Sequence, residues 1–317
     1  MFVRRSPVAL GALACAVGLP LTSCAPPGRD DSVAAGFYAL AWTTEQVAAG
    51  HWDVVNLTSP GAEPHDLELD IRTTALISEA PLIVLESGMQ PAVDAAVREN
   101  ATGEVIDAAD VVTLRPSTDH ASTHEAEHES EHGDENGDEH DGHDHGDLNP
   151  HFWLDPLLVA DLADEVAARL ADLDPEHEAD YLDHAARTRT ALEQLDQEYA
   201  EGLASCTRDT VVVTHDAFGY LEKYGLHVEP ILGLSPDAEP TVAALARLKD
   251  LIRTEGVTTV FSEPLGSDQT ASSLARSAGV KVGTLDPIEG PGQGDADSDY
   301  LSLMRTNLAT LQEANDC

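Results

Sequence analysis

The chain has 317 residues, of which 42% are hydrophobic, so it is long and apolar enough to build two ordinary domains and is not a disordered chain. It carries 58 acidic and 17 basic residues and a formal net charge of −41, which argues against nucleic acid as a partner because phosphate binding needs a basic surface. The acidic residues are spread along the chain, which is typical of a well-solvated surface that also attracts cations.

The first 23 residues have the features of an export signal. Arg4 and Arg5 precede an apolar run over 8–21, which is too short to span a bilayer as a permanent helix. The sequence LTSC follows and matches a bacterial lipobox, which predicts a lipid on Cys24; the alternative is an ordinary signal peptide with an incidental cysteine. Residues 24–32 are rich in Pro, Gly and Asp and predict a tether. We therefore expect an extracytoplasmic protein anchored in the cell membrane by lipid.

The cysteine count predicts one disulfide bond. Cleavage of the signal removes Cys15, and lipidation uses Cys24. Cys206 and Cys317 then remain as an even pair in an exported chain, where disulfides form and persist. We expect them to join the last residue to the start of the second half of the chain.

Short apolar runs alternate with helical patterns in the first half, as in parallel βα units. Thr43 and Gln46 predict a capping box at the start of a short helix that ends at Gly50. Further helices are expected from Asp70 and from Pro91. The expected strands are 33–40, 53–58, 81–86 and 105–107.

A tract rich in His, Asp and Glu, residues 117–147, interrupts this pattern. Its composition cannot bury enough apolar surface to fold, so we expect a disordered surface loop. Imidazole and carboxylate are ligands for borderline divalent metals, so the tract is interpreted as a weak metal collector or as a solvated spacer. Its histidines are His120, His124, His128, His132, His140, His143 and His145. The motif NPHFWLDP, over 149–156, follows directly.

The second half repeats the strand–helix pattern after a long helix. Asp174 and Pro175 predict the start of that helix, which at about 1.5 Å per residue is on the order of 40 Å long and can join two lobes as a stiff spacer. The expected strands are 210–214, 228–232, 257–262 and 280–285, and the other expected helices are 157–173, 245–255, 272–278 and a terminal one.

Four candidate metal ligands follow strands, where ligands bind in parallel α/β sheets. They are His65, His151, His215 and Asp286. Three imidazoles and one carboxylate form a tetrahedral set that suits Zn²⁺ better than manganese, which prefers more oxygen. Each histidine taken alone is also explained as a hydrogen-bonded loop or core residue.

Glu263 also ends a strand. It is interpreted as an acceptor that orients a histidine, with a fifth ligand or a replacement for Asp286 as alternatives. Phe152 and Trp153 are expected to pack beside the site. The histidines without such a placement are interpreted as surface or helix-face residues: His51, His177, His184 and His227.

Six motifs together resemble the zinc-binding solute-binding proteins of bacterial ABC importers: PHDLEL, NPHFWLDP, THDAFGYL, GLSPDAEPT, TTVFSEPL and TLDPIEG. The resemblance covers nearly all of the mature chain, and a His-rich loop before NPH is typical of the zinc branch. It implies a two-lobed α/β fold joined by a long helix, with the metal ligands His65, His151, His215 and Asp286 in the cleft between the lobes. The manganese branch typically has Glu where this chain has His215. The fourth position varies within the zinc branch.

The function expected from this resemblance is Zn²⁺ capture outside the cytoplasm and delivery to an importer permease, by a monomer that is not an enzyme. The alternatives are a manganese or broad-metal importer component, a surface adhesin, or a zinc hydrolase with Glu263 as its base. The hydrolase lacks an HExxH signature. The expected divisions are a signal (1–23), a tether (24–32), an N-terminal lobe (33–173), a linking helix (174–204) and a C-terminal lobe (205–317).

Overall fold

The structure is a computed structural model, and it describes residues 32–117, 148–236, 238–290 and 299–317. The expected lipidated Cys24 and the histidines of the 117–147 tract lie outside the described residues. Among the helices of the described part, none combines the length and the apolar character that crossing a membrane requires.

The first half forms a parallel four-stranded sheet in the order β2-β1-β3-β4. Its strands are β1 (Ser32–Ala35), β2 (Asp53–Asn56), β3 (Leu82–Leu85) and β4 (Glu104–Asp107). The helices between them are α1 (Tyr38–Ala48), α2 (Ile71–Glu79) and α3 (Pro91–Asn100), with a short α4 (Ala108–Val111) after β4. Asp70 caps α2 by accepting the backbone N–H of Thr73, and Pro91 occupies the first turn of α3, where its missing N–H costs nothing.

The second half forms another parallel four-stranded sheet, in the order β10-β9-β7-β8. Its strands are β7 (Thr210–Val213), β8 (His227–Pro230), β9 (Thr259–Ser262) and β10 (Lys281–Thr284). Its helices are η3 (Phe218–Tyr224), α7 (Val242–Thr254), α8 (Gln269–Ala278) and α9 (Tyr300–Asn315). A two-stranded antiparallel ribbon, β5 (Arg115–Pro116) with β6 (Leu148–Asn149), and the short η1 (Phe152–Leu154) lie before the long helices.

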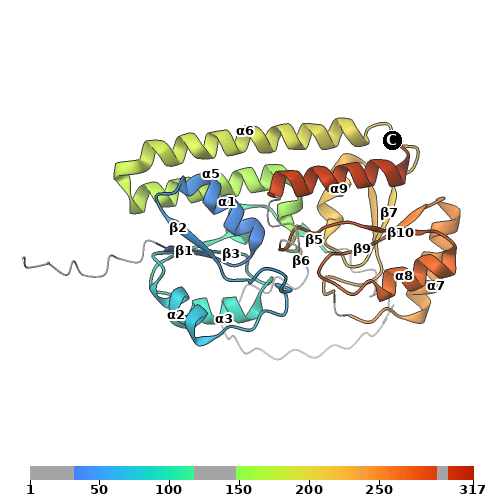
Figure 1. Cartoon of the computed structure of the whole chain (residues 1–317), viewed down its shortest axis with the longest axis horizontal. Helices are drawn as coiled ribbons and strands as arrows, with labels where there is room; N and C mark the ends of the chain where they lie inside the picture. The colour runs from blue at the N-terminus through green and yellow to red at the C-terminus, as the bar shows by residue number, and fades with distance from the viewer. Residues whose placement is uncertain (1–31, 118–147, 237, 291–298) are drawn as a thin grey trace, which may run out of the picture. The chain divides into compact units, whose positions relative to one another are not determined.

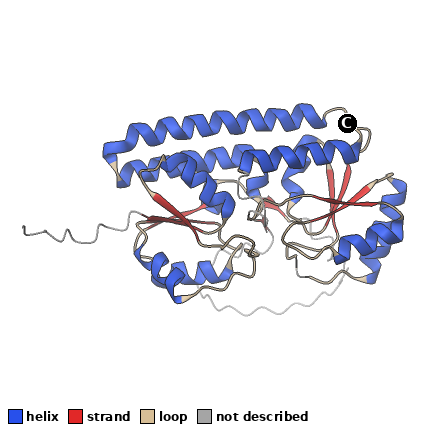
Figure 2. Cartoon of the chain, in the orientation of Figure 1, coloured by secondary structure: helices blue, strands red, loops and turns tan. Residues whose placement is uncertain are grey.

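Two long helices connect the sheets: α5 (Pro156–Leu173) and α6 (Glu178–Leu203), with the short η2 (Pro175–His177) at the turn. Figure 1 shows α5, α6 and α9 along one side of the two sheets and α2, α3, α7 and α8 along the other. Figure 2 shows the strands gathered in two groups, each flanked by helices. The fold is therefore the expected α/β arrangement of two parallel sheets and a long helix. The residue bounds of the lobes stay a prediction.

The two faces of each sheet belong to different apolar clusters, because successive side chains of a strand point to opposite faces. In β3, Leu82 and Val84 face the cluster that contains α1, α5 and α6, whereas Ile83 and Leu85 face α2 and α3. In β7, Val211 and Val213 join that same large cluster. One continuous apolar core is therefore shared by both halves, and buried residues of α5, α6 and α9 belong to it.

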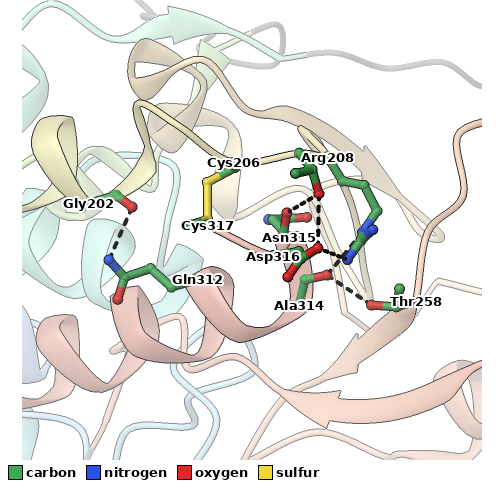
Figure 3. The surroundings of a disulfide bond; sticks show 10 residues. Gly202, Cys206, Arg208, Thr258, Gln312, Ala314, Asn315, Asp316 and Cys317 are labelled. Atoms are coloured by element: carbon green, nitrogen blue, oxygen red, sulfur yellow. Dashed lines mark hydrogen bonds and ion pairs between the residues drawn. A yellow bond between two sulfur atoms is a disulfide. The ribbon is translucent and has the colours of Figure 1, made fainter.

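The disulfide predicted from the cysteine count is present between Cys206 and Cys317. Figure 3 shows hydrogen bonds on both sides of it: Gln312 donates to Gly202 O, and Nε of Arg208 donates to Ala314 O. The bond closes a sequence separation of 111 residues and joins the end of α9 to the segment that follows α6.

The start of α1 differs from the sequence expectation. The apolar run 33–40 predicts a single strand, but β1 stops at Ala35 and α1 begins at Tyr38. The prediction of a capping box at Thr43 is wrong, because Thr43 lies inside the helix and its hydroxyl donates to Ala39 O. Tertiary burial explains the difference: most of α1 is packed in the core, so the helix forms without a polar cap at Phe37.

Candidate metal centre

Four side chains from both halves of the chain meet at one point: His65, His151, His215 and Glu289. His65 lies in the loop between β2 and α2, and His151 lies between β6 and η1. His215 follows β7 by two residues, and Glu289 lies in the loop after β10. In the described part of the chain this is the one group of three or more His, Cys, Asp or Glu residues whose ligand atoms all lie within 4.8 Å of one another.

Five of the six distances between the four ligand atoms are nearly equal. The Nε2 atom of His151 lies 3.4 Å from Nε2 of His65 and 3.3 Å from Nε2 of His215. Glu289 Oε1 lies 3.6 Å from Nε2 of His65 and 3.4 Å from Nε2 of both other histidines. When a tetrahedral Zn²⁺ has ligand bonds of about 2.0–2.1 Å, neighbouring ligand atoms are about 3.3–3.4 Å apart. These five distances therefore match the edges of a zinc tetrahedron.

Hydrogen bonds at Nδ1 hold two of the imidazoles in the orientation that points Nε2 into the cluster. His215 Nδ1 lies 2.8 Å from both carboxylate oxygens of Glu263, which can only accept, so Nδ1 carries the proton. His151 Nδ1 lies 2.8 Å from Asn149 Oδ1, and the amide of Asn149 donates to Asp216 O. This arrangement fixes Nε2 as the nitrogen available to a metal.

Burial differs among the four ligands. His151 and His215 are fully buried, and the Glu289 side chain is 2% exposed, whereas the side chain of His65 is 15% exposed. Glu289 Oε1 is buried and has no hydrogen-bond donor besides the three imidazoles, whose Nε2 atoms lie 3.4–3.6 Å from it. A buried carboxylate oxygen without a donor is costly, so its position opposite three imidazole nitrogens fits a cation.

The ionisable groups of the cluster shift one another's pKa values. Burial lowers the pKa of His151 to about 3, so that imidazole is neutral at pH 7. Burial also acts to lower the pKa of His215, but the carboxylates of Glu263 and Glu289 outweigh it and raise the pKa to about 10. Burial acts to raise the pKa of Glu289, yet hydrogen bonding to the three histidines holds it well below its usual range. The free site therefore favours an ionised Glu289 beside a protonated His215.

A further carboxylate, Glu63, lies beside the cluster and accepts the backbone N–H of His65. Burial and the nearby Glu289 carboxylate raise the pKa of Glu63 to about 7. Glu63 and Asn149 were not singled out from the sequence, although both lie within two residues of an expected ligand.

The fourth position differs from the sequence expectation, because the structure places Glu289 in the cluster and Asp286 outside it. Asp286 Oδ1 instead accepts the backbone N–H of Ile288 at 2.8 Å and so forms a tight turn. Ile288 adopts a left-handed conformation, with φ of 59°. The carboxylate that reaches the histidines is therefore the one after the turn.

Within the described part of the chain, the other residues singled out from the sequence supply no ligand atom to the cluster. Glu263 contacts Nδ1 of His215 rather than a ligand atom. Trp153 packs beside His151, as expected, and is buried with its indole N–H donated to Pro287 O. His51 lies near Asp180 and stacks on His177 at the α5–α6 turn. The hydrolase alternative requires an open fourth ligand position and Glu263 as a free base. In the structure Glu289 occupies the fourth position, and Glu263 contacts Nδ1 of His215.

Comparison with known proteins identifies the family of this chain. The family model described as "Zinc-uptake complex component A periplasmic" matches residues 33–314. The chain belongs to this zinc-uptake component family. The resemblance drawn from the sequence motifs is therefore confirmed, and the family is one of transport components that work with an ABC importer rather than of enzymes.

Two relatives illustrate the similarity to the zinc-uptake component family. The "Zinc-binding lipoprotein AdcA" of Streptococcus pneumoniae R6 is 31% identical over 310 residues, covering 96% of this chain and 60% of that protein. The "High-affinity zinc uptake system protein ZnuA" of Bacillus subtilis 168 is 31% identical over 284 residues, covering 88% of this chain and 85% of that protein. The chain thus spans just over half the length of the AdcA proteins that it matches.

A solved structure has the same fold. The Zn(II)-bound ZnuA-like domain of Streptococcus pneumoniae AdcA is 28% identical, with a TM-score of 0.71, over 90% of this chain and 99% of that one. The two-lobed architecture expected from the sequence is confirmed by this likeness together with the two parallel sheets.

Proposed function

We propose that this chain captures Zn²⁺ outside the cytoplasm and delivers it to the permease of an ABC importer, with His65, His151, His215 and Glu289 as its four ligands. The observation that carries this proposal is the spacing of the four ligand atoms, 3.3–3.6 Å over the five distances given above, which corresponds to the edges of a zinc tetrahedron. The family and its zinc-binding relatives support the same assignment.

The ligand set favours zinc over manganese. Three imidazole nitrogens and one carboxylate oxygen suit Zn²⁺, whereas Mn²⁺ prefers sites with more oxygen. The deeply buried His151 and His215 are each held by an acceptor at Nδ1, so they are presented to the ion in a single orientation. His65 is the more exposed imidazole, and we infer that the ion enters and leaves on its side of the cluster.

Native mass spectrometry of the purified chain, with and without residues 117–147, tests the proposal. We expect one tightly held zinc ion in both forms, because the four ligands lie outside the deleted residues, and we expect further weakly held ions only in the full chain. The same measurement on Glu289→Gln and His151→Ala should show loss of the tight ion. Retention of manganese in preference to zinc, or a tight ion that disappears with the 117–147 tract, would contradict the assignment.

Delivery and anchoring belong to the same proposal. The lipobox supports lipidation of Cys24, and we infer that a monomer tethered in this way supplies the permease at the membrane surface. Labelling with a radioactive fatty acid should mark the wild-type protein and not Cys24→Ala. Zinc uptake by cells that carry the partner permease should fall for Glu289→Gln although the protein remains anchored, because binding and anchoring depend on different residues.

A further inference from the structure

We infer that Asp286 is a positioning residue for Glu289: its carboxylate holds the left-handed turn at Ile288 that aims the Glu289 carboxylate at the three histidines. The inference rests on the proposed ligand set and extends it to a residue that lies outside the cluster. It is carried by the hydrogen bonds of the 286–289 segment and by its backbone conformation.

The backbone of this segment is held at three consecutive residues. Asn307, which is buried on α9, accepts the N–H of Asp286 at 2.9 Å and donates to Asp286 O at 2.6 Å. Trp153 donates its indole N–H to Pro287 O at 2.7 Å. Asp286 Oδ1 accepts the N–H of Ile288 at 2.8 Å. The first two contacts fix the start of the turn, and the third closes it.

The conformation of Ile288 shows that the turn needs such support. The φ of 59° is unfavourable for any residue with a Cβ, and a β-branched residue with positive φ is a genuine outlier. Strained residues of this kind persist only where the surroundings over-determine them. Here the buried Ile288 side chain and the Asp286 hydrogen bond do so, and the next residue is Glu289.

The orientation of Glu289 depends on this turn because its own carboxylate receives little direct support. Its Oε1 atom has no hydrogen-bond donor besides the imidazoles of the cluster itself, so nothing outside the ligand set holds that atom in place before the ion arrives. The contacts that pre-organise it therefore act through the backbone of 286–288. Partners of this kind, which orient a ligand without touching the metal, typically contribute 10–100-fold in metal affinity.

Two conservative variants separate position from charge. Asp286→Asn keeps an Oδ1 acceptor for the Ile288 N–H and removes the charge, so we expect zinc affinity within about threefold of wild type. Asp286→Glu keeps the charge and displaces the carboxylate, so we expect a loss of about tenfold or more. The reverse order would show that Asp286 acts through its charge and would overturn the inference.

A double-mutant cycle tests whether Asp286 acts through Glu289. Asp286→Ala should lower zinc affinity about tenfold in the wild-type background and by less than about twofold in Glu289→Ala, where there is no carboxylate left to position. The visible absorption of the Co²⁺-loaded Asp286→Ala protein should approach that of Glu289→Ala. Equal losses in both backgrounds, or an unchanged affinity for Asp286→Ala, would overturn the inference.

Asp107 provides a matched control, because it lies at the carboxyl end of the parallel strand β4 and its Oδ1 likewise accepts the N–H two residues on, that of Ala109. Asp107→Ala should lower the melting temperature and leave zinc affinity unchanged. Failure of the ligand proposal itself has a different signature: Glu289→Ala would then bind zinc as tightly as wild type, and the positioning role would fall with it.

Discussion

His215 presents Nδ1 to both carboxylate oxygens of Glu263, at 2.8 Å each, while its Nε2 atom lies 3.4 Å from Oε1 of Glu289. This imidazole is therefore placed between two carboxylates, which raise its pKa to about 10 although burial acts in the opposite direction. The protonated imidazole carries a proton on each nitrogen, and the proton on Nε2 must leave before that atom can coordinate a metal.

Zinc binding should release about one proton per ion at pH 7. Because the pKa of His215 is about 10 in the free protein, that imidazole is protonated at neutral pH, whereas His151, with a pKa of about 3, is already neutral. The logarithm of the zinc affinity should rise by about one for each pH unit between pH 7 and pH 9. Calorimetry in buffers of different ionisation enthalpy measures the protons released.

The same linkage predicts a weaker affinity in acid. Affinity should continue to fall between pH 7 and pH 5, because protons compete with the metal for imidazole nitrogen. An affinity that does not change between pH 5 and pH 9 would contradict both the proton assignment at His215 and a site built from three histidines.

Glu263→Gln should weaken zinc binding by about 10–100-fold without removing a ligand, because it abolishes the carboxylate that orients His215 and fixes its tautomer. The proton release should fall below one in this variant, since a neutral amide no longer favours the charged imidazole. Competition with a chelating dye measures the affinity. Glu255→Gln is the control, because this exposed carboxylate at the end of α7 should leave both quantities unchanged.

Replacing Cys206 and Cys317 by serine should lower the free energy of unfolding by about 4–5 kcal/mol, the value that the chain-entropy model gives for a loop of roughly 100 residues. Zinc affinity should stay near that of wild type, because the bond joins the end of α9 to the segment after α6 rather than contacting a ligand. Urea denaturation of the metal-free protein gives the difference. Addition of a reductant should reproduce the effect in wild type and have no effect on the serine variant.

Ile288→Gly should be more stable than Ile288→Ala by about 1 kcal/mol, which reverses the usual order of the two residues. Both variants lose the buried side chain, but only alanine retains a Cβ that opposes the left-handed φ of 59°. Denaturant titration of the two metal-free variants compares their free energies of unfolding. If alanine proves the more stable, the turn at Ile288 is not strained as described.

Much of the fold was predictable because its signals are local. Continuous apolar runs mark the buried parallel strands, and Asp70 and Pro91 mark the starts of α2 and α3. The start of α1 was not predictable in this way, because the run 33–40 is apolar throughout and a buried helix and a buried strand then have the same pattern. Packing against α5 and α6 decides between them.

The ligands of the candidate site were also predictable only in part. His65, His151 and His215 follow strand or motif signals that the sequence carries, and the structure brings all three together. Glu289 was missed because the choice between it and Asp286 depends on the left-handed turn at Ile288, a conformation that a β-branched residue rarely adopts. Neither the residue type nor its spacing from the strand contains that information.

Trp153 joins the segments of two ligands: its ring centre lies 5.2 Å from that of His151, and its indole N–H bonds to Pro287, two residues before Glu289. Its own carbonyl accepts the hydroxyl of Tyr300. Because the indole contacts both ligand segments, a displacement of either segment changes the surroundings of the ring. The protein thus contains an intrinsic fluorophore whose emission can follow loading and unloading of the centre in real time, without an attached dye.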